Sequence, residues 1–199
     1  VPAMGVGLCS VWAAWLWKGH KRAAFLVVSG ILMGLALQIK FTASILIPAL
    51  LVDLALEAWE THGHCTPRRL RSLGTPLMWI ISGAGSFFAL AASFPGWSLD
   101  LLWFSHAAAS AATSIKPTAS FHLHHLADGI PMLCGVGFFV ALSIVNREWK
   151  RFLFFHVLLL TVCFIHFWHR PFWDYYLLHF DIAMSLPAGI AMAQFFTAS

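Results

Sequence analysis

Long hydrophobic runs separated by short polar breaks dominate the pattern of this chain. Seven such runs are visible, and each is close to the roughly 20 apolar residues that a helix needs to cross a bilayer. They cover residues 1–17, 23–39, 42–58, 76–94, 129–146, 152–168 and 177–197. The pattern therefore predicts an all-α fold, a polytopic bundle of about seven transmembrane helices.

The composition agrees with a protein that faces lipid. Of the 199 residues, 60% are hydrophobic and 10% are charged, whereas a soluble domain carries about 25% charged residues. The first residues, VPAMGVG, contain no basic leader and no initiator Met. We therefore expect an internal fragment of an integral, multi-pass membrane protein, with residues 1–199 in a single transmembrane domain. We expect no nucleic-acid partner.

Basic residues alternate between the breaks. Nine of the twelve Lys and Arg residues fall in every second break, namely Lys18, Lys21, Arg22, Arg68, Arg69, Arg71, Arg147, Lys150 and Arg151. Because basic loops stay on the cytoplasmic side, the other connections are predicted to face outward. These are the turn at Lys40, the segment 95–128 and the segment 169–176.

The outward segment 95–128 is predicted to hold two short interfacial helices. LDLLWFSHAAASAA can lie on the membrane surface, and FHLHHLAD leads into the next run. On a helix His122 and His125 share a face, and so do His124 and Asp128, so the two pairs, or one pair with His106, are candidate ligands for a divalent metal. Histidines that hydrogen-bond to headgroups or loop carbonyls are the alternative interpretation.

Features inside the runs predict how the helices pack. Gly30 and Gly34 form a GxxxG pair that permits close helix contact. Pro48 predicts a kink in the third run. Asp53 and Glu57 lie one helical turn apart near its cytoplasmic end. We expect them to reach water or to pair with the arginines of 68–71.

The stretch WHRPFWDYYLLHFD, residues 168–181, concentrates reactive side chains on the outer face. Arg170, like Lys40, is a cation that can pair with a phosphate group. Lysine that reaches the outer headgroups, and aromatic rings of the interfacial belt, are the structural alternatives. The candidate substrate-binding residues are Lys40, Arg170, His169, Asp174, Tyr175, Tyr176, His106 and Asp181.

Three stretches carry a resemblance to a known family. SGILMGLALQIKFTASILIPALL joins a small-residue helix, a tight turn with Lys40 and a helix with a proline, and HRPFWDYYLLHFDIAMSLPAGIAM runs from an outer loop into a helix. Together with the opening VPAM, they resemble family 39 glycosyltransferases, bacterial relatives of the protein O-mannosyltransferases in the C-type membrane glycosyltransferase superfamily. Asp181 differs from that family, in which a proline or apolar residue is usual.

The resemblance implies a function. Such enzymes transfer a sugar, a hexose such as mannose or a pentose, from a polyprenyl-phosphate carrier to a protein, lipid or glycan acceptor on the extracytoplasmic face. By position, Lys40 and Arg170 would contact the carrier phosphate. The family's catalytic Asp would lie upstream of Val1, so the catalytic residues are expected outside this sequence. The bacterial plasma membrane is the implied location.

Two other classes of protein stay open. A transporter or flippase for a lipid-linked or anionic solute would use the same outer cations without making or breaking a bond. The polar residues gather at one face and no internal repeat is visible, which favours an enzyme. A haem or metal redox protein is the third class, because the chain has eleven His. His156 and His166, in one run, are too far apart to share one haem.

Overall fold

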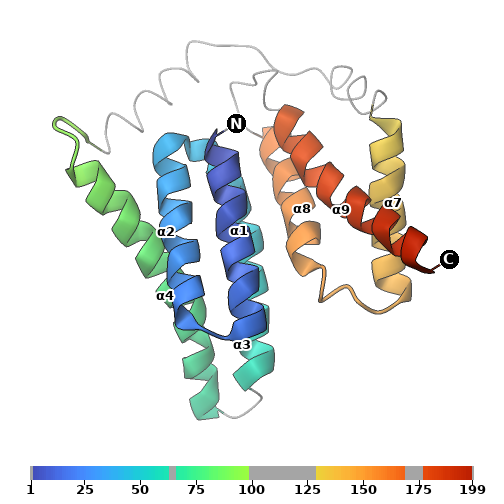
Figure 1. Ribbon diagram of the computed structural model, residues 1–199, viewed down its shortest axis with the longest axis horizontal. Helices are drawn as coiled ribbons and strands as arrows, with labels where there is room; N and C mark the ends of the chain where they lie inside the picture. The colour runs from blue at the N-terminus through green and yellow to red at the C-terminus, as the bar shows by residue number, and fades with distance from the viewer. Residues whose placement is uncertain (1, 63–65, 99–128, 169–176, 199) are drawn as a thin grey trace. The chain divides into compact units, whose positions relative to one another are not determined.

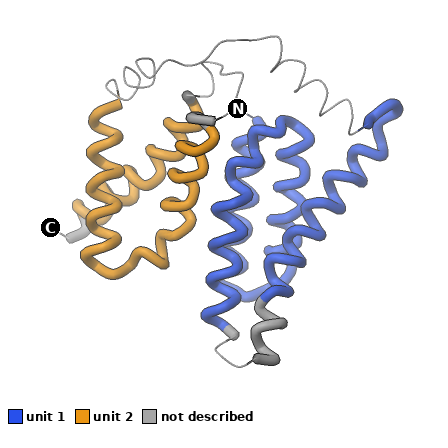
Figure 2. Tube along the Cα trace, turned by 180° about the vertical axis from the view of Figure 1, so that it is seen from behind, with its two compact units in different colours: residues 1–98 blue, residues 99–199 orange. Residues whose placement is uncertain are grey.

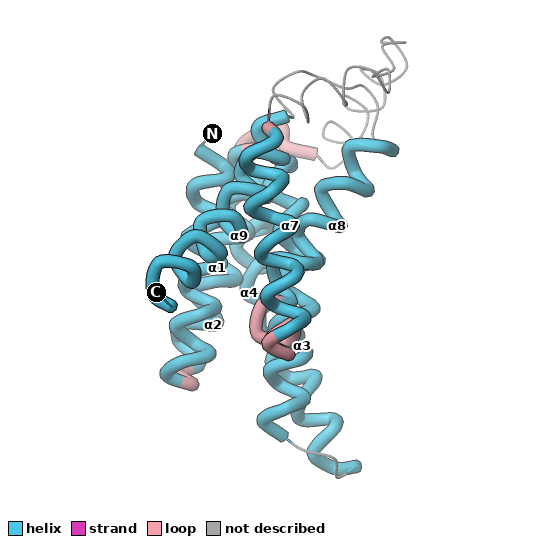
Figure 3. Tube along the Cα trace, turned by 90° about the vertical axis from the view of Figure 1, so that its right-hand side faces the viewer, coloured by secondary structure: helices cyan, strands magenta, loops and turns pink. Residues whose placement is uncertain are grey.

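The structure is a computed structural model that describes residues 2–62, 66–98, 129–168 and 177–198 (Figure 1). Within these ranges the chain forms seven α-helices and one short 3-10 helix, and it contains no strand (Figure 3). The all-α prediction is therefore confirmed for the described part of the chain. The two interfacial helices predicted in 95–128 lie almost wholly outside it.

The chain divides into two compact units, residues 1–98 and 99–199 (Figure 2). Unit 1 holds α1 (Pro2–His20), α2 (Ala23–Ile39), the 3-10 helix η1 (Phe41–Ile45), α3 (Leu46–His62) and α4 (Thr66–Ala92). Unit 2 holds α7 (Ile130–Val145), α8 (Leu153–Trp168) and α9 (Leu177–Ala198). Each unit is described by itself.

Every predicted hydrophobic run overlaps one of these helices, and one helix boundary differs clearly from the prediction. The helix α4 begins at Thr66, well before the predicted start at 76, and contains Pro76. Hydropathy marks only the apolar part of a helix, and Pro67 is tolerated in a first turn. Pro48 lies two residues after the point where η1 passes directly into α3, and the kink predicted there stays a prediction.

Two segments of the described helices are long and apolar enough to cross a membrane. They are Phe41–Thr61, across η1 and α3, and Leu73–Ala92 of α4. Three further apolar helices, Ala23–Ile39, Ile130–Val145 and Leu153–Ile165, are shorter. The helices thus follow the predicted order, and the seven-crossing bundle stays a prediction.

Helices α2 and α4 pack closely because both present small residues. A Cβ added to Gly30 would lie 2.5 Å from the Trp79 carbonyl oxygen, and one added to Gly34 would lie 2.3 Å from the Gly83 carbonyl oxygen. Neither site admits a larger side chain without moving backbone. The close contact predicted from the GxxxG pair is confirmed, and its partner is α4.

A buried hydrogen-bond cluster joins three helices of unit 1. The hydroxyl of Ser10 on α1 donates to the Ser29 carbonyl of α2, and the Ser29 hydroxyl donates to the Ser10 carbonyl, each over 2.7 Å. The Trp79 indole N–H of α4 donates to the Ser29 hydroxyl over 2.9 Å. Polar side chains that satisfy one another in this way hold helices together where water is absent.

Unit 2 is built around α9 and an aromatic cluster. Helices α7 and α8 both contact α9, and Gly135 of α7 faces the Ala188 methyl group. The ring of Phe139 meets those of Phe152 and Phe155 edge-on, at centroid distances of 5.1 and 5.9 Å. Such edge-to-face pairs add to the stabilisation from burial itself.

Candidate functional site

Lys40 forms the whole connection between α2 and η1. Its backbone is extended, with φ −162° and ψ 128°, and its N–H donates to the Ala36 carbonyl over 3.0 Å. Its own carbonyl accepts from the Ala43 N–H over 3.1 Å. The Lys40 side chain is exposed, flanked by the exposed apolar residues Ile39 and Phe41. The tight turn expected from the sequence is confirmed.

The first turns of α1 pack behind this turn. Ala3 of α1, Ala36 of α2 and Ala43 of η1 form one buried cluster, and Gly7 faces Leu46. Methyl groups allow the three backbones to approach closely at this point. The beginning of α1 therefore lies beside the Lys40 turn, so two of the stretches that carry the family resemblance meet in the structure.

A side chain of α2 also ties this end to α4. Gln38, two residues before Lys40, donates from its amide nitrogen Nε2 to the Phe87 carbonyl over 2.7 Å. The Ser86 hydroxyl makes a second bridge, to the Ile31 carbonyl over 3.2 Å. The end of α2 is thus held on two sides, by α1 and by α4, which fixes the backbone that carries Lys40.

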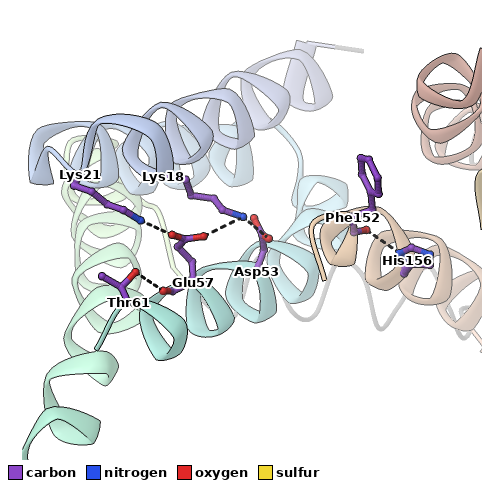
Figure 4. Close-up of polar contacts among 7 residues, drawn as sticks. All are labelled: Lys18, Lys21, Asp53, Glu57, Thr61, Phe152 and His156. Carbon is purple, nitrogen blue, oxygen red and sulfur yellow. Dashed lines mark hydrogen bonds and ion pairs between the residues drawn. The ribbon is translucent and has the colours of Figure 1, made fainter. Parts of the chain in front are cut away.

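The opposite ends of α1 and α3 form a charge network (Figure 4). Nζ of Lys18 lies 2.9 Å from Oδ1 of Asp53 and 3.7 Å from Oε2 of Glu57, and Lys21 pairs with the other Glu57 oxygen. Asp53 is only 2% exposed and Lys18 is 24% exposed. The second carboxylate oxygen of Asp53, Oδ2, is buried and accepts no hydrogen bond from the side chains that the structure describes.

The aromatic residues of α1 complete this network. The Lys21 ammonium lies 5.0 Å above the centroid of the buried Trp17 ring, a cation–π contact. Trp15 also interacts with the Asp53 carboxylate. The two lysines and two acids balance in charge, so the network holds a carboxylate inside the unit without leaving it isolated.

The sequence identified Asp53 and Glu57 and named other partners for them. They were expected to reach water or to pair with the arginines of 68–71. The described ion pairs are with Lys18 and Lys21, and the side chains of 68–71 lie outside the description, so that pairing stays a prediction. The sequence contained the signal for the pairing with Lys18 and Lys21. Two lysines three residues apart end one helix, and two acids four residues apart end another on the same predicted side.

The predicted outer site in unit 2 is described only at its edge. Asp181 is partly exposed near the start of α9, and His179 beside it is buried. The other candidate substrate-binding residues, His106, His169, Arg170, Asp174, Tyr175 and Tyr176, lie outside the described residues, as do His122 and His125. Their roles stay predictions.

His156, which is partly buried in unit 2, makes two hydrogen bonds. Its Nδ1 lies 2.8 Å from the Phe152 carbonyl, which can only accept, so this nitrogen carries a proton. Its Nε2 lies 3.1 Å from the hydroxyl of the buried Ser143, and the Phe139 ring lies against the imidazole. Both ring nitrogens are thus engaged with protein, which does not favour His156 as a haem ligand. The side chain of His166 is not described.

The described residues offer no group of three or more His, Cys, Asp and Glu side chains that could hold a metal ion. No protein-family model matches the chain, and no curated protein or solved structure shows significant similarity to it. The arguments for function therefore rest on the residues and their arrangement.

Proposed function

We propose that this chain is part of an integral, multi-pass membrane glycosyltransferase of a bacterial plasma membrane. It moves a sugar from a polyprenyl-phosphate carrier to an acceptor on the extracytoplasmic face. One observation carries the proposal beyond the sequence resemblance. The Ala3, Ala36 and Ala43 cluster places the beginning of α1 directly behind the Lys40 turn. In the proposed enzyme this brings the acidic loop upstream of Val1 next to the cation that holds the carrier phosphate.

The reaction assigns a role to each group. The acceptor hydroxyl oxygen attacks the anomeric carbon of the sugar, and the bond from that carbon to the carrier phosphate oxygen breaks. The hydroxyl proton passes to the carboxylate that the resemblance expects upstream of Val1. The leaving polyprenyl phosphate gains negative charge, which the Lys40 ammonium and the Arg170 guanidinium stabilise.

The surroundings of Lys40 suit a lipid-linked phosphate. The ammonium sits at the end of a helix pair, and its neighbours Ile39 and Phe41 are exposed and apolar, 52% and 49%. A cation at the boundary between apolar and polar surroundings can meet a headgroup phosphate while the lipid chain stays in the membrane. Tyr175 and Tyr176 of the outer stretch are proposed to face sugar or lipid with their rings.

The test is sugar transfer by the purified full-length protein from a polyprenyl-phosphate sugar. Lys40→Met nearly keeps the length of the side chain and removes its charge, and Arg170→Met removes the charge of the second cation. Each is expected to lower kcat/KM by about 10²-fold, the size of effect seen when one group that stabilises developing charge is removed. Arg151→Met is the matched control, because Arg151 is an exposed cation in the α7–α8 connection.

A transporter for a lipid-linked or anionic solute is the second candidate, and the Lys18–Asp53 pair favours it. Ionisable side chains buried in membrane helices often line solute or proton paths. The two candidates separate in one comparison with purified protein in vesicles. Release of free polyprenyl phosphate with glycosylated acceptor supports the enzyme, and solute uptake without bond cleavage supports the transporter.

A further inference from the structure

Helix α1 connects the two polar regions of unit 1. Its first turns pack behind the Lys40 turn through Ala3 and Gly7, and its last turn carries Lys18 into the charge network. An α-helix rises about 1.5 Å per residue, so Ala3 and Lys18 lie about 22 Å apart on one continuous element. A constraint on one end of α1 therefore bears on the other.

Hydrogen bonds hold the middle of α1, whereas apolar packing holds its beginning and ion pairs hold its end. Ser10 is bonded reciprocally to Ser29 of α2, with Trp79 of α4 behind it. Helix α1 contacts α2 extensively and α3 much less. Among the described contacts, the ion pairs of Lys18 and Lys21 with Asp53 and Glu57 link α1 to α3. If the end of α1 loses its ionic partner, we expect the helix to pivot about the hydrogen bonds of Ser10 at its middle.

We propose that Lys18 and Asp53 are positioning residues for the Lys40 turn. Their ion pair sets the rotation and register of the end of α1 against α3, and α1 carries that setting to the cluster of Ala3, Ala36 and Ala43 behind Lys40. The consequence for sugar transfer rests on the proposed function. The positional claim itself rests only on the geometry of unit 1.

The chemistry of the pair favours positioning over adhesion. An apolar pair of similar volume holds two helices together as well as a buried ion pair does, and often better. What the ions add is direction. Lys18 reaches Asp53 and Glu57, which lie on successive turns of α3, so one ammonium defines both a height and a rotation. With leucine and methionine in the same places, the end of α1 could shift along α3 or rotate against it without losing the apolar contact.

The experiment measures the position of α1 at its far end. In full-length protein without the native cysteines, spin labels are attached at Gly5→Cys and Ile39→Cys. A Cβ at Gly5 meets no atom within 4 Å, and Ile39 is 52% exposed, so both positions accept a label. The distance between the labels is compared with and without the double change Lys18→Met, Asp53→Leu.

Removal of both charges is expected to shift the mean distance between the labels by about 1–2 Å, or to broaden its distribution, as in helix displacements of known switches. A label pair at Val28 and Ile80 is the control, because α2 and α4 are held by Gly30 and Gly34, and it should not change. Arg151→Met should leave the first distance unchanged. An unchanged distance in the double variant overturns the proposal.

Two further measurements keep the test decisive. Asp53→Asn preserves the side-chain shape and is the variant to use if the double change does not fold, with the same shift expected and the same unchanged result as refutation. Sugar transfer is measured in parallel. A shifted distance with normal transfer supports the positional claim and counts against the role of Lys40, so the two proposals fail separately.

Discussion

Lys18 and Lys40 look alike in the sequence and differ in the structure. Each is a lysine beside a hydrophobic run of unit 1, Lys18 in a basic break with Lys21 and Arg22, and Lys40 as the one basic residue of its turn. Lys18 is largely buried and bridges Asp53 and Glu57 on a second helix. Lys40 is exposed and forms the complete turn between α2 and η1. The comparison teaches that burial and ion pairing tie one charge at the end of an apolar run to the fold, while exposure leaves the other accessible to a ligand.

The surroundings of Lys18 and of Lys40 also differ in the side chains that are packed against them. Behind Lys40 lie the methyl groups of Ala3, Ala36 and Ala43, which let the backbones approach closely, and the Lys40 side chain itself is exposed. Lys18 lies against the carboxylates of Asp53 and Glu57, and the rings of Trp17 and Trp15 contact the same network at Lys21 and at Asp53. We therefore expect loss of Lys18 to weaken the fold and loss of Lys40 to weaken only function.

The largest expected effect on stability follows Lys18→Met. This change leaves Asp53, 2% exposed, without its ionic partner. Breaking a buried pair from one side destabilises by about 3–5 kcal/mol, because the remaining charge is buried alone. Thermal or denaturant unfolding in detergent measures it. Loss of less than 1 kcal/mol would mean that water reaches Asp53 and that the pair is a surface contact.

A change of intermediate size is expected at the α2–α4 contact that supports the Lys40 end. Gly34→Ala places a Cβ 2.3 Å from the Gly83 carbonyl oxygen, so backbone must move. Overpacking of this kind destabilises by about 1–3 kcal/mol. Gly85→Ala on α4 is the control, since its Cβ meets nothing within 4 Å and alanine favours helix. Equal behaviour of the two variants would show that α2 and α4 do not pack this closely.

A smaller loss is expected from Ser29→Ala, midway between the two lysines. It removes the acceptor of the Trp79 indole N–H and a donor to the Ser10 carbonyl, both buried. An unpaired buried donor costs about 1–2 kcal/mol. The control is Ser93→Ala. The exposed Ser93 hydroxyl donates to the Leu90 carbonyl of its own turn, so its loss should change the unfolding free energy by only a few tenths of the change expected for Ser29→Ala. If both variants lose the same unfolding free energy, the hydrogen bonds among Ser10, Ser29 and Trp79 do not hold α1.

The smallest expected effect on stability follows Lys40→Met. An exposed side chain away from buried networks contributes within about 0.5 kcal/mol. The same unfolding measurement checks it, with Lys40→Arg beside it. A loss as large as that of Lys18→Met would remove the contrast between the two lysines and assign Lys40 to the fold.

The hydrophobic pattern predicted the helices and their order because each run is long enough to form a helix by itself. It could not predict that α4 starts at Thr66, since the first turns of that helix are polar and basic. The Gly30 and Gly34 contact was visible because glycine spacing reports close approach directly. Its partner, α4, was not visible, since any helix with small residues would serve.

The site was predictable only in part for the same reason. The turn at Lys40 was predicted because a single charged residue separates two hydrophobic runs, which is a local feature of the sequence. The partners of Asp53 depend on which helix lies beside α3, and a sequence lists several basic candidates within reach. The Ser10, Ser29 and Trp79 cluster lies on three ordinary helices, and its bonded pairs are 19 and 50 positions apart in the sequence. Serine in an apolar run gives no local sign of such a bond.

The most direct test of the central claim is the rate of sugar transfer by full-length Lys40→Met from a polyprenyl-phosphate donor. The proposed function predicts that kcat/KM falls by about 10²-fold, while the unfolding free energy matches that of the unmodified protein. Transfer at the unmodified rate would contradict the claim and would remove Lys40 from the site.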